Sequence, residues 1–244
     1  MPPAPSPSSL EQRLGHAFRR PELLTEALTH ASYLQDHPEA GANNQRLEFL
    51  GDSVLHLILT DALYRELPAE REGGLSRSRA ALVRGGFLSR LARDLGLDAH
   101  IRLGASEDAA GGRTRASILE DALEAVIGAI YLDSGLAETH RVVLGWYGPL
   151  GPTLAALEDA ENPKGRLQEL LQAHSSKGPI YRVVHESGPD HSKHFEAVVE
   201  WEGRQIGAGT GSSKKQAETV AAEAALAALP ELMAQAVVAA PKSD

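Results

Sequence analysis

The stretch "NNQRLEFLGDSVL", residues 43–55, places two carboxylates inside an apolar helical pattern. Its leucines, phenylalanine and valine recur at the three- and four-residue spacing of one helix face, which is typical of a helix packed in a core. Glu48 and Asp52 are four residues apart, so their side chains project from the same side of that helix. The pattern therefore predicts a packed helix that carries two neighbouring acids.

A second apolar helix repeats this arrangement. In "SILEDALEAVIGAIYLD", residues 117–133, Asp121 and Glu124 are three residues apart and again share a face. Like charges partly withdrawn from water repel one another and cost several kcal/mol unless protons or cations neutralise them. A hard divalent ion such as Mg²⁺ relieves this cost, since it takes oxygen ligands from a few carboxylates. The spacing alone leaves a second interpretation open, in which the acids are solvated or paired with Arg46 or Arg115.

Length and composition indicate a globular protein. With 244 residues, of which 42% are hydrophobic, the chain is long enough for one large domain or two ordinary ones. It has no cysteine, which excludes disulfides and thiolate metal sites. The start, "MPPAPSPSSL", lacks the features of an export signal, and no run approaches the roughly 18 apolar residues of a membrane span. We therefore expect a cytoplasmic protein without a membrane partner.

The charge balance is acidic overall. A net charge of -9 argues at first against a nucleic-acid partner, because phosphate binding usually leaves a basic footprint. The sum does not say where the charges sit, however, and local clusters decide binding. A nucleic-acid partner therefore stays open.

The first part of the chain has a helical pattern almost throughout. Residues 10–157 show it, after a Pro- and Ser-rich segment, residues 1–9, that is predicted to be a disordered tail. The predicted helices include residues 21–31, 46–67, 75–97 and 117–135, the last of which ends at Gly135. This part is predicted to be an all-helical domain.

The second part has a different pattern. Acids, Asn and Pro interrupt the helical spacing and suit a linker at residues 158–162. Residues 163–230 are predicted to be a small α+β domain in the order helix, three antiparallel strands, helix (α-β-β-β-α), with a tight hairpin at Glu202 and Gly203. Residues 231–244 are expected to be a frayed tail. The predicted fold class is multidomain: an all-α domain followed by this α+β domain.

The motifs of the first domain resemble those of the ribonuclease III family. "NQRLEFLGDSVL" is similar to the family pattern N-E-R-L-E-F-L-G-D-S/A-V/I-L, and so many consecutive agreements make chance an unsatisfactory explanation. "ALTHASY", "EGGLSRSRAALV" and "GGRTRASILEDALEAVIGAIYLD" match further family motifs, and the resemblance runs from about Leu10 to Leu229. It implies a helical endonuclease domain that acts on double-stranded RNA.

The resemblance also implies roles for individual acids. Glu48, Asp121 and Glu124 match positions that bind metal in relatives, and Asp52 and Glu124 match those named as catalytic. Glu72 matches a further acid near the site, for which the alternative is a solvated loop glutamate.

Two positions depart from the family pattern. Gln45 stands where many relatives carry Glu; it keeps hydrogen bonding but cannot serve as an anionic ligand, so its expected role is a supporting one. Glu120 stands where Ala is common, and we expect it to be an exposed surface residue; the alternative is that, as an exposed neighbour, it adds negative potential to the site.

The implied reaction is Mg²⁺-dependent hydrolysis of double-stranded RNA, with Mn²⁺ as an expected substitute, leaving 5′-phosphates and short 3′ overhangs. Bound metal lowers the pKa of water and offsets charge on the leaving oxygen. Ribosomal RNA precursors and other structured transcripts are the implied substrates. Because a duplex has two strands, the implied assembly is a homodimer through the catalytic domain, with Phe49 near the interface; the alternative is that Phe49 fills its own core.

The second domain resembles a double-stranded RNA-binding domain, through "KGRLQELLQ", "GPDHSKHF" and "GTGSSKKQAETVAAEAAL". Lys214 and Lys215 begin a helix whose free N–H groups already favour anions, so they suit phosphate contacts. Duplex RNA is read mostly through its minor grooves, where 2′-hydroxyls separate it from DNA. The full set of predicted RNA-binding residues is Gln168, Glu169, His191, Ser213, Lys214 and Lys215.

Other classes of protein fit the sequence less well. A non-catalytic double-stranded RNA-binding or structural protein predicts loss of the acids, yet all four are present. The glycines of "LGASEDAAGG" lack the strand context and lysine of a phosphate loop, so no nucleotide cofactor is expected.

Overall fold

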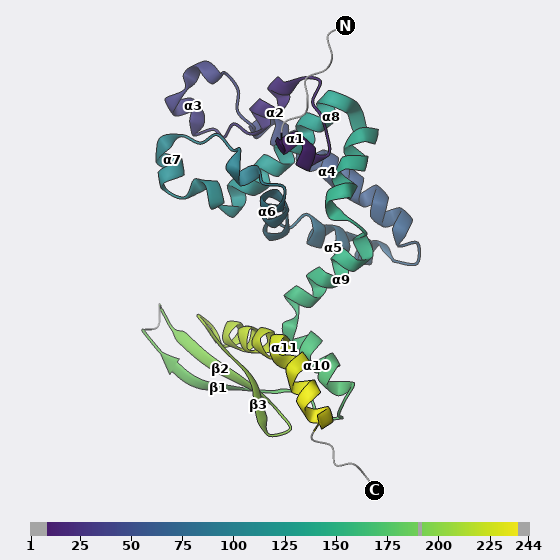
Figure 1. Cartoon of the computed structure of the whole chain (residues 1–244), viewed down its shortest axis with the longest axis vertical. Coiled ribbons are helices and arrows are strands. Elements are labelled where there is room, and N and C mark those ends of the chain that lie inside the picture. Colours follow the sequence, from purple (N-terminus) through teal and green to yellow (C-terminus); the bar gives the residue numbers. More distant parts are fainter. Residues whose placement is uncertain (1–8, 190–191, 239–244) are drawn as a thin grey trace. The chain divides into compact units, whose positions relative to one another are not determined.

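The computed structural model of the chain describes residues 9–189 and 192–238. The chain divides after Leu154 into two compact units, here called the helical unit and the C-terminal unit (Figure 1). The predicted N-terminal tail, residues 1–9, lies outside the described residues except for Ser9, which begins the first helix.

The helical unit matches the predicted fold class, and within its described residues the only β pairing is an isolated bridge between Thr29 and Arg102. Its elements are α1 (Ser9–Leu14), α2 (Pro21–Ala27), α3 (Tyr33–Asp36), η1 (Pro38–Ala40), α4 (Gln45–Glu66), α5 (Glu72–Leu82), α6 (Gly85–Asp94), η2 (Leu97–Ala99), α7 (Ala105–Ala109), η3 (Gly112–Thr114) and α8 (Ala116–Tyr147), and α9 (Leu150–Glu161) begins in it. The helix expected at 75–97 is divided, because the backbone at Arg84 is extended (φ -68°, ψ 132°).

The core of the helical unit lies where α4 and α8 cross. Two glycines make this crossing close: a Cβ on Gly51 would overlap the backbone carbonyl of Glu124, and a Cβ on Gly128 would overlap that of Leu47. Fully buried aliphatic side chains surround the crossing on both helices; they include Leu55, Leu59, Leu119, Leu123 and Ile127. The two helices that carry the predicted acids therefore form the centre of the unit.

Helix α8 changes direction at Gly135, where the backbone leaves the helical region (φ 79°, ψ 176°). The predicted end of the helix at Gly135 corresponds to this kink, and a second helical segment continues to Tyr147. Next to the kink, the buried Asp133 accepts hydrogen bonds from the backbone N–H groups of Arg19 and Arg20 and contacts His16 at 3.1 Å. These contacts hold the segment between α1 and α2 against the bend in α8.

The C-terminal unit has the predicted α-β-β-β-α order. Its elements are α10 (Pro163–Gln172), β1 (Ile180–Ser187), β2 (His194–Trp201), β3 (Arg204–Gly211) and α11 (Lys214–Val238), and the sheet is antiparallel in the order β1-β2-β3. As the alternation predicts, Phe195, Ala197 and Val199 are buried. Glu202 (φ 52°) and Gly203 (φ 79°) form the two-residue hairpin between β2 and β3.

Helix α11 packs closely on β3 (Figure 1). A Cβ on Gly207 or Gly209 would overlap the backbone of α11 at Ala221, so these strand positions require glycine. Alanines on the helix complete the contact; Ala217, Ala221, Ala222 and Ala225 are fully buried.

The structure differs from expectation at two boundaries. The expected linker at 158–162 is helical as far as Glu161, because its Glu and Ala residues favour helix and only Asn162 and Pro163 interrupt it. Asn162 then caps α10 by accepting a hydrogen bond from the Gly165 N–H at 3.0 Å. Likewise α11 continues to Val238, into the expected tail at 231–244, since that sequence is rich in helix-favouring residues. None of the described helices is long and apolar enough to cross a bilayer.

Candidate active site and RNA-binding surface

The crossing of α4 and α8 brings the four predicted acids to one place. Glu48 and Asp52 flank Gly51 on α4, and the backbone carbonyl of Glu124 faces that glycine from α8. Asp121 lies one turn before Glu124 on the same face. The site is thus positioned by backbone packing between two core helices.

Burial and neighbouring carboxylates raise the pKa values of acids at this crossing, most of all that of Glu124. The pKa of Glu124 rises to about 8, first because of burial and then because of Asp52 and three other carboxylates nearby. Burial, followed by the charges of Asp121 and Asp52, raises the pKa of Glu48. The pKa of Asp121 is raised by burial, and a positive charge on His30 opposes that rise. The crossing therefore concentrates negative charge in a half-buried place.

Glu120 is a fifth member of this group, and the expectation that it is an exposed surface residue is wrong. Its side chain is half-buried, and its carboxylate lies against Gly85 at the start of α6. Its charge contributes to the raised pKa values of Glu48 and Glu124. Residue type alone did not reveal this, because the position of α6 relative to α8 decides it. The acid cluster is hereafter Glu48, Asp52, Glu120, Asp121 and Glu124.

The alternative in which arginines neutralise the acids does not fit the structure. Arg115 forms its ion pair with Glu107 instead. Arg46 is exposed, and among the described residues no ion pair joins it to a carboxylate.

The donor set of the acid cluster suits a hard divalent cation, since every side chain in it offers carboxylate oxygens. Within residues 9–189 and 192–238, however, no three His, Asp or Glu side chains are arranged closely enough to hold an ion as they stand. The chain thus supplies the charge and the ligand type at the crossing, while the carboxylate oxygens remain apart.

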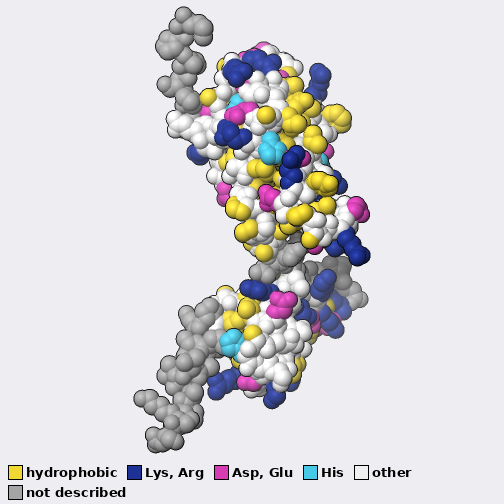
Figure 2. Space-filling view, turned by 90° about the vertical axis from the view of Figure 1, so that its right-hand side faces the viewer, with side chains coloured by type: hydrophobic (Ala, Val, Ile, Leu, Met, Phe, Trp, Pro, Cys, Tyr) yellow, Lys and Arg dark blue, Asp and Glu magenta, His cyan; other side chains and the backbone are white. Residues whose placement is uncertain are grey.

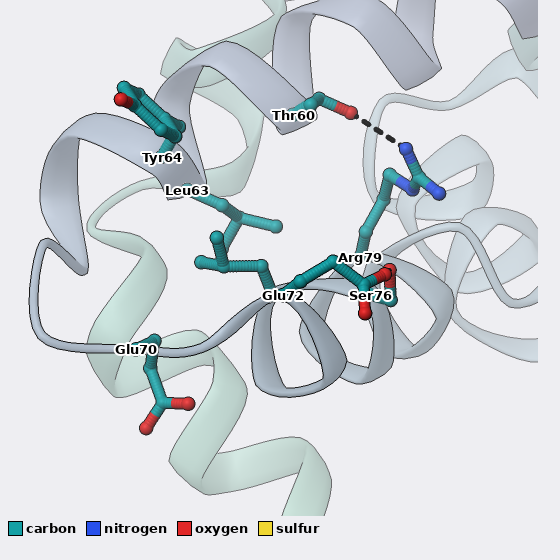
Figure 3. Close-up of a pocket in the computed structure, with 8 residues that line it drawn as sticks. Thr60, Leu63, Tyr64, Glu70, Glu72, Ser76 and Arg79 are labelled. Atoms are coloured by element: carbon teal, nitrogen blue, oxygen red, sulfur yellow. Dashed lines mark hydrogen bonds between the residues drawn. The ribbon is translucent and has the colours of Figure 1, made fainter.

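The two supporting residues lie at other hollows. Glu72 begins α5, accepts a hydrogen bond from Ser76 at 2.8 Å, and lines a hollow of about 510 Å³ beside the end of α4 (Figure 3). In the same hollow Arg79 donates a hydrogen bond to Thr60 at 3.0 Å (Figure 3). Gln45 begins α4 and lines a second hollow of about 630 Å³. Neither is among the groups that shift the pKa values of the cluster.

Two histidines lie near the cluster: the contact of His56 was not predicted, whereas the family resemblance of "ALTHASY" predicts that His30 supports packing near the site. His56 lies 3.4 Å from the Asp52 carboxylate, one turn along α4. A positive charge on His30 opposes the rise in the pKa of Asp121. The Nδ1 atom of His30 accepts a hydrogen bond from the Ser32 N–H at 3.2 Å. The four-residue spacing of Asp52 and His56 was a usable signal for the first contact. The position of His30 depends on tertiary packing, which spacing does not give.

The predicted RNA-binding residues of the C-terminal unit are exposed where they are described. Ser213 caps α11 by accepting a hydrogen bond from the Gln216 N–H at 3.2 Å, and Lys214 and Lys215 follow it; these three residues are called the basic helix start. Gln168 and Glu169 are exposed on α10, whereas His191 lies outside the described residues. The lysine charge is not free, because Lys214 lies 3.6 Å from the Glu186 carboxylate.

Comparison with known proteins covers both units. A family model described as ribonuclease-III-like matches residues 20–149, and the double-stranded RNA binding motif matches residues 163–229. Ribonuclease 3 of Thermobifida fusca (strain YX) is 48% identical over 209 residues, covering 86% of each chain. Ribonuclease 3 of Pelotomaculum thermopropionicum is 44% identical over 218 residues, covering 89% of this chain and 90% of that one.

A solved structure shares the fold of the helical unit. The nuclease domain of ribonuclease III from Campylobacter jejuni is 41% identical, with a TM-score of 0.53, and the match covers 56% of this chain and 92% of that one. Both domains, their order and the whole-chain identity agree, so the chain is an endoribonuclease of double-stranded RNA. It belongs to the ribonuclease III family.

Proposed function

We propose that this chain hydrolyses double-stranded RNA at the acid cluster with Mg²⁺, leaving 5′-phosphates and short 3′ overhangs. The observation that carries the proposal is the half-buried group of carboxylates at the α4–α8 crossing, in which the pKa of Glu124 is raised to about 8. Such a group is costly without a cation and is well suited to one. Mn²⁺, which also accepts oxygen ligands, is the proposed substitute.

Glu48, Asp121 and Glu124 are the proposed metal ligands, because burial raises the pKa of each of them and they come from both helices. Bound metal would supply a water of lowered pKa and offset charge on the leaving oxygen. Binding would also draw in carboxylate side chains that now stand apart.

Asp52 and Glu124 are the proposed catalytic residues. The Asp52 side chain is 51% exposed, so it can meet water and substrate directly, and His56 lies 3.4 Å from its carboxylate. Glu124 is ionised with difficulty at neutral pH without a counter-charge, so its carboxylate becomes fully available only where positive charge is present. Gln45 and Glu72, at the two separate hollows, are proposed to support the RNA rather than the metal.

The C-terminal unit is proposed to bind the duplex through the basic helix start, with Gln168 and Glu169 on α10 and His191 at the neighbouring groove. The N-terminal end of α11 favours anions, and the two adjacent lysines that begin it suit phosphate oxygens. Exposure of these side chains supports the proposal.

A homodimer through the helical unit is the proposed assembly. Phe49 is 78% exposed, so it does not fill the core of its own unit. It lies on a hollow with Leu23, Leu50 and Leu132, and Figure 2 shows hydrophobic side chains gathered on one face of this unit. The Campylobacter jejuni nuclease domain is described as having a region involved in dimer formation. A second copy would cover this apolar surface and supply one acid cluster for each RNA strand.

Cleavage of a labelled RNA duplex tests the proposal. We expect cutting with Mg²⁺ and none with a chelator, with 5′-phosphates on the products. Binding without cutting under both conditions would favour the rival function, a non-catalytic RNA-binding protein. The proposed substrates are ribosomal RNA precursors and other structured transcripts, and the proposed location of the protein is the cytoplasm. Mapping of cut RNA ends in cells would identify the substrates.

A further inference from the structure

One carboxylate lies between two lysines beside the basic helix start. The Glu186 side chain accepts a hydrogen bond from Lys193 Nζ at 2.9 Å, and its other oxygen lies 3.6 Å from Lys214 Nζ. Lys193 immediately precedes β2, and Lys214 is the first residue of α11. An acid therefore occupies the place between the cations that a phosphate would approach.

The sheet register explains why Glu186 points there. Glu186 on β1 is paired with Phe195 on β2, and partners across a sheet project to the same face. Phe195 is buried against Ala217 of α11, so the helix covers that face. Glu186 therefore emerges on the helix side of the sheet, at the rim where α11 begins.

The three side chains form an exposed, exchangeable group. Lys193 is 38% exposed, Glu186 40% and Lys214 62%. The hydrogen bond from Lys193, supported by the charges of both lysines, holds the pKa of Glu186 below its usual range, so the acid is ionised at neutral pH. Exposed ion pairs contribute little stability, and a phosphate can therefore replace Glu186 at Lys214 at small cost.

We propose that Glu186 is an internal counter-anion that lowers the affinity of the C-terminal unit for duplex RNA and reduces the salt dependence of binding. The inference deepens the proposed function and rests on it, because it requires Lys214 to meet RNA phosphate. The segment 163–229 contains as many basic as acidic residues. One acid beside Lys214 therefore strongly affects the electrostatic potential at the basic helix start. A restrained affinity would favour release of the cut duplex.

Glu186→Gln is the direct test, since it removes the charge and keeps the shape. At low salt we expect the variant to bind duplex RNA about three- to tenfold more tightly, the effect of one unit charge within several ångströms of a phosphate. The slope of log affinity against log salt should steepen by up to about 0.9, the value for one more phosphate contact. The two proteins should converge at high salt, where screening removes the difference.

Glu200→Gln is the matched control. Glu200 forms an ion pair of the same kind, 3.2 Å from Arg182, and it alternates with the buried Val199 so that it lies on the opposite face of β2. Both substitutions remove one negative charge from the unit. Only Glu186→Gln should tighten binding.

Binding would be measured by fluorescence anisotropy with the full chain, a labelled RNA duplex of about two helical turns, and chelator to prevent cutting, at several salt concentrations. Equal or weaker binding by Glu186→Gln, with an unchanged melting temperature, overturns the inference. If Glu186→Gln has a lower melting temperature than wild type, Glu186→Ala is measured as well, because it removes the same charge. Wild-type binding by Lys214→Ala would instead refute the proposed RNA interface, so the two failures are distinguishable.

Discussion

The acid cluster and the basic helix start use charge in opposite ways. At the α4–α8 crossing, packing at Gly51 and Gly128 holds carboxylates half-buried beside one another. At the start of α11, lysines are exposed and a nearby acid offsets one of them. Half-burial makes the ionisation of each carboxylate depend strongly on a nearby cation. Exposure to water makes the ion pairs of each lysine weak, so that their partners exchange readily. Changes at the acid cluster should therefore alter the cleavage rate, and changes at the basic helix start should alter the affinity for RNA.

The largest effect is expected at Glu124. Glu124→Gln keeps the side-chain shape but removes a proposed ligand, and we expect cleavage to slow by a hundredfold or more, since several kcal/mol of transition-state stabilisation are lost at about 1.4 kcal/mol per decade. Single-turnover cleavage of a labelled duplex measures this. Duplex binding in chelator should stay within about twofold; a variant that cuts at the wild-type rate would refute the assignment.

A glycine substitution separates packing from chemistry. Gly51→Ala introduces a methyl group that overlaps the Glu124 carbonyl, so we expect about 1–3 kcal/mol of lost stability together with slower cleavage, as the helices move apart. Urea unfolding and cleavage rates would be compared with those of Gly86→Ala, whose added Cβ meets nothing within 4 Å. Normal stability and activity in Gly51→Ala would show that the close crossing is not required.

The basic helix start should affect affinity alone. For the double substitution Lys214→Ala and Lys215→Ala we expect about tenfold weaker duplex binding and a shallower salt slope, because phosphate contacts are lost. The cleavage rate at saturating RNA should be nearly unchanged. Lys177→Ala, an exposed lysine in the loop before β1, is the control. A fall in the saturated rate without a change in affinity would contradict the division of roles.

The smallest effect concerns pH in metal-free protein. The pKa of Glu124 is about 8 in the folded state and 4.5 ordinarily, so the folded chain holds a proton that the unfolded chain has released. Stability from this group is therefore fully present below about pH 4.5 and is lost as pH rises through 8. Melting temperature in chelator should fall between pH 6 and 9 less steeply for Glu124→Gln than for wild type. Equal slopes of melting temperature against pH for the two proteins would show that the pKa of Glu124 is not raised in the folded state.

Much of the fold and of the candidate site could be predicted from local sequence patterns. The spacing of Glu48 with Asp52 gave a shared helix face, and the alternation at Phe195 gave the buried side of β2. Glu120 and the Glu186–Lys214 pair could not be predicted in the same way. Each depends on how two elements distant in sequence are placed against each other, by the position of α6 in one case and by sheet register in the other.

The helix boundaries were predicted less well, for a related reason. The acids, Asn and Pro near residues 158–162 predict a linker, yet only Asn162 and Pro163 interrupt the helices, which composition does not show. Likewise a frayed tail is expected at residues 231–244, yet α11 passes Pro230 and continues to Val238. Single residues of low helix propensity are overridden when neighbours on both sides favour helix.

The contact between Gly51 and Gly128 has a consequence for how this site can be lost. A chain that kept all five acids but carried a larger residue at either glycine would still look like a nuclease when its carboxylates were counted. Its helices would be pushed apart, and the carboxylates of α4 and α8 would no longer lie together at the crossing. Inactive relatives should therefore be sought at these two small residues as well as among the acids.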